Sequence, residues 1–157
     1  MMAENFRIDS LDKRILRSLQ RNGRIQNVDL AKEVGLSPSP CLRRVRLLED
    51  VGVIDRYVAI LNPEKINQSM VVFAQVWLSD QTMETTERFV YEIKLLPQII
   101  ECYIMAGECD FMLKIRIESL EEYRRFQNNH LYRIKGVQNI KTEIPLQIIK
   151  QTTELPL

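Results

Sequence analysis

Apolar side chains in the first third of the chain recur at the spacing of helices. A first stripe repeats every four residues and consists of Leu11, Ile15 and Leu19. We expect a helix that is capped by Asp9 or Ser10 and runs to about Arg21. Asn22-Gly23 should end it, because both residue types tolerate the left-handed conformation that is common at helix stops.

A second, shorter helix is predicted from Asn27, which can cap it, to Gly35, which breaks it. Its inward side chains would be Leu30, Ala31 and Val34. The residues 34–37 then form a tight turn before the next helix. Two helices joined in this way are typical of a helix-turn-helix, whose second helix enters the DNA major groove.

The third helix has two possible starts, Ser37 before Pro38 and Ser39 before Pro40. A residue before proline resists helical backbone angles, which favours the later start at Ser39. The expected tightness of the turn favours Ser37, which we adopt. The inward side chains would then be Leu42, Val45 and Leu48. Gly52 is expected to end this helix.

From residue 53 the pattern changes to that of strands. Residues 53–61 predict a strand that Asn62-Pro63 ends, and the polar run to Ser69 is the expected linker. Residues 70–78 are almost continuously apolar, as in a strand covered on both faces. The next predicted elements are a helix capped by Thr82 and ending before Pro97, a strand over 99–105, a strand over 111–118, and a helix capped by Ser119 and running to about Ile134. A strand over 140–148 follows, in which Pro145 argues for an edge position or a bulge.

The order strand, helix, strand, strand, helix, strand is the ferredoxin-like arrangement. The predicted fold class is therefore α+β, with an N-terminal (winged) helix-turn-helix domain and a C-terminal ferredoxin-like βαββαβ domain. The expected segments are 1–61 for the helix-turn-helix with its following strand, 62–69 for a linker, 70–150 for the ferredoxin-like domain and 151–157 for a C-terminal tail. Two helices cover one face of such a sheet, so the apolar positions of the other face predict self-association.

Composition and charge agree with this division. Of 157 residues, 45% are hydrophobic and 27% are charged, which is ordinary for a globular protein. The net charge is +1, but residues 1–61 hold 11 lysines and arginines against 8 acidic residues, and the remainder holds 11 against 13. A basic front (+3) and a slightly acidic back (−2) suit a phosphate-facing module followed by one that does not bind DNA.

Catalytic and metal-binding chemistry find no support in the sequence. His130, expected near the inward side of the last helix, is the single histidine, and no C-x-x-C spacing occurs. Cys41, Cys102 and Cys109 therefore suit free thiols in the cytoplasm. Residues 1–5 lack the basic start of a signal peptide, and no apolar run reaches the ~18 residues of a membrane span. We expect a cytoplasmic protein without enzymatic activity, cofactor or membrane partner.

Basic side chains on the third helix predict how the protein would contact DNA. Arginine offers a planar fork for guanine and a fixed charge for phosphate. Arg43 and Arg46 are expected to face the duplex, with Arg44 nearer the DNA backbone. The other predicted contacts, at the helix start and against flanking phosphates, are Ser37, Ser39, Arg24 and Lys32. Without the turn before it, such a basic run would be an ordinary solvated helix face.

The turn around Gly107 has the groups that an amino acid needs. Glycine suits the left-handed angles of a tight turn between antiparallel strands. Asp110 could accept hydrogen bonds from an ammonium group, and backbone N–H groups near Ala106, Gly107 and Glu108 could hold a carboxylate. Met105, with apolar side chains from a neighbouring subunit, could contact an apolar side chain. The alternative is a plain hairpin with a solvated aspartate.

Several stretches of the sequence resemble the Lrp/AsnC family of transcription regulators. In the first half they are Ile8-Asp9-Ser10-Leu11-Asp12, Asn22-Gly23-Arg24, Leu30-Ala31-Lys32-Glu33-Val34-Gly35-Leu36-Ser37-Pro38 and Arg43-Arg44-Val45-Arg46-Leu47-Leu48-Glu49. In the second half, Gly107-Glu108-Cys109-Asp110-Phe111 is similar to the Gly-x-x-Asp-aromatic turn of that family's effector-binding domain. Cys109 departs from the pattern, since an aromatic or acidic residue is common there.

The resemblance implies a homodimer, often assembled as an octamer of four dimers, that binds double-stranded promoter DNA and senses a small amino acid. We expect an apolar effector, leucine or methionine, whose binding favours one arrangement of the dimers and so sets the spacing of the DNA-binding helices. One alternative is a constitutive architectural DNA-binding oligomer that senses nothing. Another is an enzyme or metabolite carrier on a ferredoxin-like fold, with the front half as a helical cap.

Overall fold

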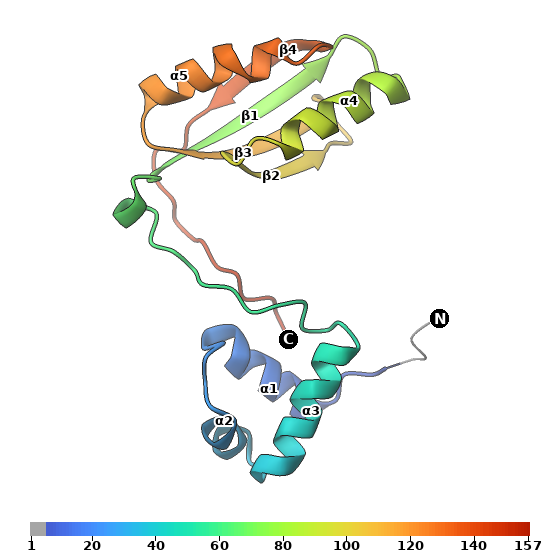
Figure 1. The fold of residues 1–157 in the computed structure, drawn as a ribbon, viewed down its shortest axis with the longest axis vertical. Helices are drawn as coiled ribbons and strands as arrows, with labels where there is room; N and C mark the ends of the chain where they lie inside the picture. The colour runs from blue at the N-terminus through green and yellow to red at the C-terminus, as the bar shows by residue number, and fades with distance from the viewer. Residues whose placement is uncertain (1–5) are drawn as a thin grey trace. The chain divides into compact units, whose positions relative to one another are not determined.

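The computed structural model describes residues 6–157, and the chain divides into two compact units (Figure 1). Residues 1–5, on which the expected absence of a signal peptide depends, lie outside the described residues. The first unit extends to Ile60 and also contains Lys150–Leu157, whereas the second unit is Leu61–Ile149. The C-terminal segment is therefore part of the first unit, although the whole second unit separates them in sequence.

The first unit is built from α1 (Ser10–Arg21), α2 (Asn27–Val34) and α3 (Pro38–Asp50). Their apolar stripes meet in one core, whose buried members are Ile15, Leu16, Leu30, Ala31, Val34, Cys41, Val45 and Leu48. Gly35 turns the chain between α2 and α3 with a φ of 73°, a left-handed conformation that glycine adopts without steric cost. The predicted three helices and their tight turn are thus present.

The start of α3 distinguishes between the two alternatives left by the sequence. Ser37 precedes the helix with extended backbone and Pro38 is its first residue, so the earlier start is confirmed. Proline is tolerated there because the first N–H of a helix has no intrahelical partner. The prediction that Leu42 is a core residue is wrong, since it is 38% exposed and Cys41 is fully buried instead.

Three further predictions for the first unit are wrong in detail. The residue that caps α2 is Gln26, and Asn27 is the first helical residue. The helix α1 ends before Asn22, as expected, but the φ of Asn22 is −144° and therefore not left-handed. Residues 53–61 form no strand, because no neighbouring strand among the described residues pairs with their backbone groups. Most side chains of this segment are exposed.

The second unit is a four-stranded antiparallel sheet with two helices. The strands are β1 (Met70–Leu78), β2 (Ile99–Ile104), β3 (Phe111–Ile117) and β4 (Val137–Glu143), and the helices are α4 (Met83–Lys94) and α5 (Leu120–Asn129). There are also two short 3-10 helices. η1 (Glu64–Ile66) precedes β1, and η2 (Leu131–Arg133) follows α5. The strand order is β2-β3-β1-β4, which confirms the predicted ferredoxin-like βαββαβ domain and the α+β class. Thr82 and Ser119 cap the two helices as predicted.

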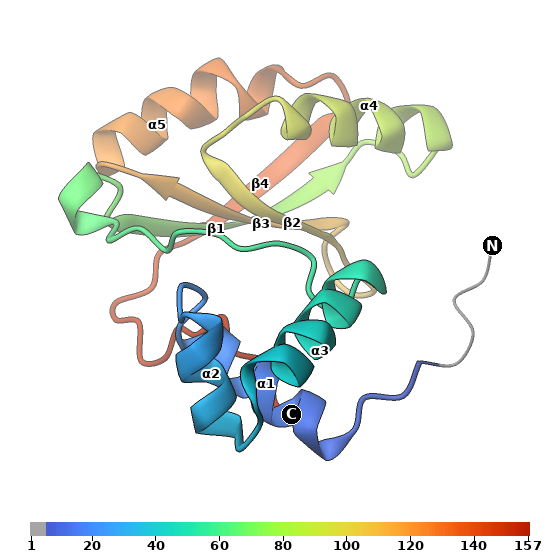
Figure 2. The same cartoon turned by 60° about the horizontal axis from the view of Figure 1, so that its bottom comes forward.

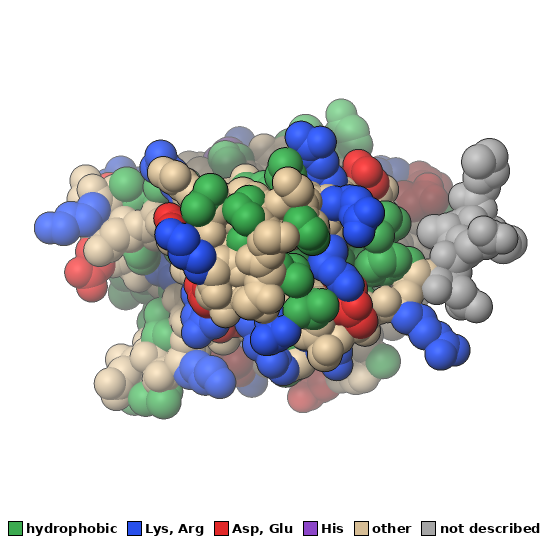
Figure 3. Space-filling model, turned by 90° about the horizontal axis from the view of Figure 1, so that it is seen from below, with side chains coloured by type: hydrophobic (Ala, Val, Ile, Leu, Met, Phe, Trp, Pro, Cys, Tyr) green, Lys and Arg blue, Asp and Glu red, His purple; other side chains and the backbone are tan. Residues whose placement is uncertain are grey.

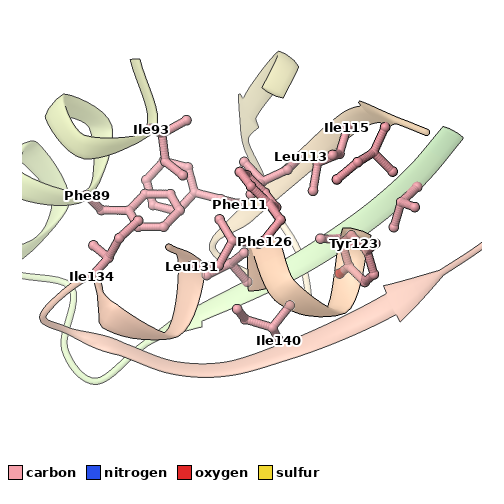
Figure 4. Close-up of a cluster of buried hydrophobic side chains, with 14 of the residues drawn as sticks. Phe89, Ile93, Phe111, Leu113, Ile115, Tyr123, Phe126, Leu131, Ile134 and Ile140 are labelled. Carbon is pink, nitrogen blue, oxygen red and sulfur yellow. The ribbon is translucent and has the colours of Figure 1, made fainter. Parts of the chain in front are cut away.

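Both helices pack on one face of the sheet and enclose the larger core (Figure 2). Figure 4 shows Phe89 of α4 next to Phe111 of β3, with Tyr123 and Phe126 reaching toward the sheet from α5. The ring centroids of Phe89 and Phe111 lie 4.5 Å apart in a tilted arrangement. The opposite face is half-buried within one chain, and its side chains on the two central strands include Phe73, Gln75, Trp77, Met112, Lys114 and Arg116.

Two elements near the C-terminus are shorter than predicted. β4 lies at an edge of the sheet, as Pro145 indicated, but it ends at Glu143 rather than at residue 148. A proline has no N–H for a strand ladder, so pairing stops before it. α5 ends at Asn129, and η2 replaces its predicted last turn before Ile134.

The single histidine and the cysteines take no part in a metal site among the described residues. His130 is exposed rather than inward-facing, and its ring centroid lies 5.3 Å from that of Phe126. The three cysteines are free, with Cys41 and Cys109 buried and Cys102 exposed. None of the described helices has the length and apolar character that crossing a membrane requires.

Candidate nucleic-acid interface and ligand-binding loop

The outer side of α3 carries two arginines that the protein does not use internally. Arg43 and Arg46 are exposed, and within the described chain neither side chain has an ion pair or hydrogen bond. Residues three apart lie on the same side of a helix, so the two guanidinium groups can act together. Lys and Arg side chains are visible at several points of the surface in Figure 3. This pair is available for guanine edges or phosphates.

The start of α3 offers hydroxyl groups and one backbone donor. Ser37 and Ser39 are exposed, and the Ser37 hydroxyl makes no capping hydrogen bond. Because Pro38 and Pro40 have no N–H, Ser39 supplies the available backbone donor in the first turn. Asn27, which was predicted to cap α2, instead donates from Nδ2 to the carbonyl of Pro38 at 2.8 Å and so fixes the turn against α2.

The two predicted flanking contacts are solvent-accessible. Arg24 is exposed, and its side chain has no partner within the described chain. Lys32 lies 3.6 Å from Asp29, and both side chains are more than half exposed. An exposed pair of this kind is weak, so the ammonium group of Lys32 can exchange Asp29 for a phosphate at little cost.

Arg44 lies in a different environment from Arg43 and Arg46. Its Nη1 donates to Oδ2 of Asp9 at 2.8 Å and to Oδ1 of Asp12 at 2.7 Å. The Arg44 side chain is 31% exposed, and that of Asp12 is only 5% exposed. The structure thus uses the charge of Arg44 inside the first unit, between α3 and α1, where the sequence predicted a contact with the DNA backbone.

The start of α1 is itself a reciprocal cap. The backbone N–H of Asp12 donates to Asp9, and the backbone N–H of Asp9 donates to Asp12. The hydrogen bond from the Asp12 backbone, together with Arg44, lowers the pKa of Asp9 below its ordinary value. The carboxylate of Asp9 is therefore stabilised as an anion.

A second polar contact joins α1 to α2. Ser18, which is 2% exposed, donates its hydroxyl to Glu33 at 2.9 Å. Arg21 reaches the same carboxylate at 3.4 Å. Each helix of the helix-turn-helix is thus attached to α1 by an acidic group.

The loop between β2 and β3 spans residues 105–110, and it is longer than the tight turn that the sequence predicted. Gly107 does not have a positive φ, so the expected left-handed glycine is wrong, and a Cβ added there would meet no atom within 4 Å. The backbone N–H groups of Ala106, Gly107 and Glu108 have no acceptor within the described chain. Trp77 donates its indole N–H to the Glu108 carbonyl at 2.7 Å and thereby holds the loop to β1.

Asp110 is anchored within the second unit and is not a solvated aspartate. Its Oδ2 accepts from the backbone N–H of Leu78 at 2.7 Å, and its Oδ1 accepts from Nε2 of Gln81 at 2.8 Å. Its own backbone N–H donates to the carbonyl of Val76, and its carbonyl accepts from Met105. A carboxylate has about four lone-pair sites, so these bonds leave capacity for an ammonium group.

A cavity of about 210 Å³ opens next to Asp110. Its lining residues are Leu78, Gln81, Thr86, Ile104, Met105, Asp110 and Phe111. Of the predicted residues, Asp110 and Met105 line this cavity, whereas Ala106, Gly107 and Glu108 do not. Sequence reasoning missed Gln81, which precedes the cap of α4, and Thr86 in the first turns of α4, because no local motif connects them to the loop.

A larger cavity, of about 400 Å³, lies in the first unit between α1, residues 53–57 and the C-terminal segment. Gln20 of α1 binds this segment twice, donating to the carbonyl of Leu155 at 3.1 Å and accepting from its N–H at 2.6 Å. Arg17 donates to the carbonyl of Leu157, whose side chain packs against the helical core. No local pattern in the sequence indicates this contact.

One further carboxyl, that of Asp80 just before α4, has a strongly lowered pKa. Asp80 accepts hydrogen bonds from the hydroxyl and backbone N–H of Thr82, at 2.5 and 3.1 Å. These hydrogen bonds, that of the Thr82 side chain first, lower the pKa of Asp80 from 3.8 to about 2. Asp80 is therefore a carboxylate that supports the start of α4.

Comparison with known proteins gives consistent matches along the chain. Residues 71–155 match the "Lrp/AsnC ligand binding domain" model, and residues 8–55 match the "winged helix-turn-helix DNA-binding" model. The chain is 41% identical to the leucine-responsive regulatory protein of Haemophilus influenzae over 98% of its own length and 92% of that protein. It is 39% identical to the Escherichia coli protein of the same name, over 94% and 90% of the two lengths.

A solved structure with the same architecture contains a bound amino acid. It is a transcriptional regulator from Neisseria meningitidis in complex with L-methionine, with a TM-score of 0.92 and 36% identity. The match covers 96% of this chain and 97% of that one. A regulatory protein from Mycobacterium tuberculosis, also complexed with L-methionine, has a TM-score of 0.81 at 26% identity, covering 95% and 99%.

Proposed function

Because the chain belongs to the Lrp/AsnC family of DNA-binding transcription regulators, we propose that α3 binds promoter DNA and that an amino acid binds beside Asp110. The family consists of regulators and not of enzymes, so the enzyme or carrier alternative falls. Such a regulator acts on chromosomal DNA, and we assign it to the cytoplasm, where its free thiols remain reduced.

The proposed DNA face is centred on Arg43 and Arg46. The observation that carries it is that both guanidinium groups are exposed and unpaired on the outer side of the second helix of the motif. Ser37 and Ser39 at the helix start, and Arg24 and Lys32 at the flanks, would contact phosphates. Direct readout of double-stranded DNA would then come from the arginine pair.

The proposed effector is an apolar amino acid, leucine or methionine. Asp110 would accept from its ammonium group, and the unbonded N–H groups of Ala106, Gly107 and Glu108 would donate to its carboxylate. Met105 and the other apolar lining residues would contact its side chain. The relatives named leucine-responsive and those solved with L-methionine support this choice.

We propose that the protein forms a homodimer and, through it, an octamer of four dimers. The half-buried apolar side chains Phe73, Trp77 and Met112 on the uncovered sheet face support self-association. Effector binding next to β3 and α4 would favour one arrangement of the dimers and so change the spacing of paired α3 helices. Sedimentation with and without amino acid measures the assembly.

Titration calorimetry with leucine, methionine and lysine tests the sensing function. Heat with leucine or methionine and none with lysine is expected, because Asp110 is the single acidic side chain of the cavity lining and the α-ammonium group would already occupy it. The competing function is a constitutive architectural DNA-binding protein, favoured by the fact that Asp110 already has two internal partners. No heat with any of the three amino acids, in a protein that still binds DNA, would establish that competitor.

A further inference from the structure

Three charged side chains between α1 and α3 form what we call the Arg44 cluster: Asp9, Asp12 and Arg44. We propose that this cluster sets the angle at which α3 is presented to DNA, so that Arg44 is a positioning residue and not a DNA contact. The proposal rests on the proposed role of α3 as the helix that reads DNA. It assigns to Arg44 a function different from that of its neighbours Arg43 and Arg46.

The hydrogen bonds of the Arg44 cluster connect it to the backbone of α1. Asp9 uses Oδ1 for the backbone N–H of Asp12, at 2.8 Å, and Oδ2 for Arg44. Asp12 uses Oδ2 for the backbone N–H of Asp9, at 3.1 Å, and Oδ1 for Arg44. Each carboxylate thus accepts one hydrogen bond from the backbone at the start of α1 and one from the guanidinium group of Arg44. A single Nη1 bridging two fixed carboxylates leaves α3 little freedom to tilt against α1.

The electrostatics of the Arg44 cluster oppose phosphate binding. Two carboxylates share one guanidinium, so the cluster carries a net negative charge. A phosphate would have to displace Asp12, whose side chain is 5% exposed, and leave its charge without a cation. Such a buried unpaired charge is strongly unfavourable. Arg44 is therefore retained by the protein when DNA binds.

Helix geometry places Arg44 on a different side of α3 from Arg43 and Arg46. Successive residues on an α-helix differ by about 100° around the axis, so Arg44 points away from the side shared by Arg43 and Arg46. Because both of those arginines are carried by one rigid helix, a tilt of α3 displaces their guanidinium groups together. Bidentate contacts to guanine depend on narrow distances and angles, so the tilt weakens specific binding more than non-specific binding.

The experiment compares three variants of the full-length protein, Arg44→Gln, Asp12→Asn and the double variant. The specific probe is a duplex that the wild-type protein has selected from a randomised pool, and the non-specific probe is poly(dI-dC). Affinities are measured over a salt series, since each phosphate contact contributes about 0.9 to the slope of log affinity against log salt. Asp55→Asn, which removes an exposed acidic group outside the cluster, is the matched control.

We expect Arg44→Gln and Asp12→Asn each to weaken specific binding by roughly tenfold, because a tilted α3 loses part of its bidentate base contacts. The salt slope and the affinity for poly(dI-dC) should remain near wild type, and the double variant should bind no more weakly than the weaker single one. The sign for Asp12→Asn is decisive, because removing an acidic group should otherwise strengthen binding to a polyanion. Asp55→Asn should cause no loss.

Two results would overturn the proposal. The first is a slope that falls by about 0.9 in Arg44→Gln, with Asp12→Asn binding as tightly as wild type or more so, which makes Arg44 a phosphate contact. The second is an equal loss of specific and non-specific binding that follows the unfolded fraction in thermal melts. Asp9→Asn, which keeps a good capping residue, repeats the test if Asp12→Asn does not fold. The proposed DNA-binding role of α3 is tested separately: it would be contradicted if Arg43→Gln changed neither the specific affinity nor the salt slope.

Discussion

Helix α3, the proposed DNA-binding helix, and the loop of residues 105–110, the proposed ligand-binding loop, use their charged residues in different ways. On α3, Arg43 and Arg46 are free for a ligand, while Arg44 is bonded to Asp9 and Asp12. In the loop, Asp110 is both the proposed ligand-binding group and the acceptor of hydrogen bonds from Leu78 and Gln81. Recognition and support are thus divided between residues at the first site and combined in one residue at the second. Substitutions should separate the two roles at α3 but not at Asp110.

The largest effect is expected from Arg43→Ala combined with Arg46→Ala. Loss of two bidentate contacts, each of about 1–3 kcal/mol, should weaken specific DNA binding about a hundredfold or more. Neither side chain has an internal partner, so the melting temperature should stay at the wild-type value. Gel-shift titration and thermal melts measure both quantities. Arg56→Ala, which removes an exposed cation of the same unit, is the control. An equal loss of specific DNA affinity in the control and in the double variant would show that the arginines of α3 contribute only overall positive charge.

Asp110→Asn should impair ligand binding and stability together. An amide keeps one acceptor for Leu78 or Gln81 but loses the negative charge that an ammonium group requires. Hydrogen bonds to charged groups contribute about 1.5–3 kcal/mol, so amino-acid affinity should fall at least tenfold. Calorimetry and melts of Asp110→Asn and of Glu87→Gln, an exposed acid on α4, make the comparison. Unchanged melting with abolished binding would show that the two roles are separable after all.

Gln20→Ala removes a supporting contact that has no role in recognition. The two hydrogen bonds between the Gln20 side chain and the Leu155 backbone are lost, which should destabilise the first unit by about 1–2 kcal/mol. The C-terminal segment should also become more sensitive to limited proteolysis. Gln26→Ala, which has no side-chain capping bond, serves as the control. Identical cleavage in wild type and Gln20→Ala would mean that Gln20 does not hold the segment.

The smallest effect concerns Asp80, a carboxylate that only supports structure. Its pKa is about 2 in the folded protein and 3.8 ordinarily, so its contribution to stability is present above pH 3.8 and is lost as pH falls through 2. In Thr82→Val the pKa should rise toward the ordinary value, because the hydroxyl donor is gone. NMR titration of the Asp80 carboxyl follows this. A pKa near 3.8 already in the wild-type protein would contradict the hydrogen-bond account.

The sequence predicted the elements whose determinants are local. Gly35 with Ser37-Pro38 specified the turn and the start of α3, and alternation over residues 111–117 specified β3. The strand expected over 53–61 was wrong, because β-forming residues do not supply the partner that a strand needs. Element order was enough to predict the sheet, since few topologies join these elements without crossings.

The site residues also divide into those that local sequence predicts and those that depend on tertiary packing. Arg43 and Arg46 were identifiable because position on a helix alone exposes them. The pairing of Arg44 with Asp9, thirty-five residues away, depends on how α1 and α3 pack, which no local pattern contains. Gln81 and Thr86 reach the cavity beside Asp110 only through the fold of the sheet and α4. Charge and spacing thus predicted the groups, and packing determined what each of them binds.

Footprinting of promoter DNA with and without leucine and methionine, for wild type and Asp110→Asn, tests the central claim that ligand binding in one unit controls DNA binding by the other. We predict that the wild-type protein changes its affinity or its pattern of protection when the amino acid is added, and that Asp110→Asn gives the ligand-free pattern under both conditions. Identical footprints of the wild-type protein with and without saturating amounts of each amino acid would contradict the account.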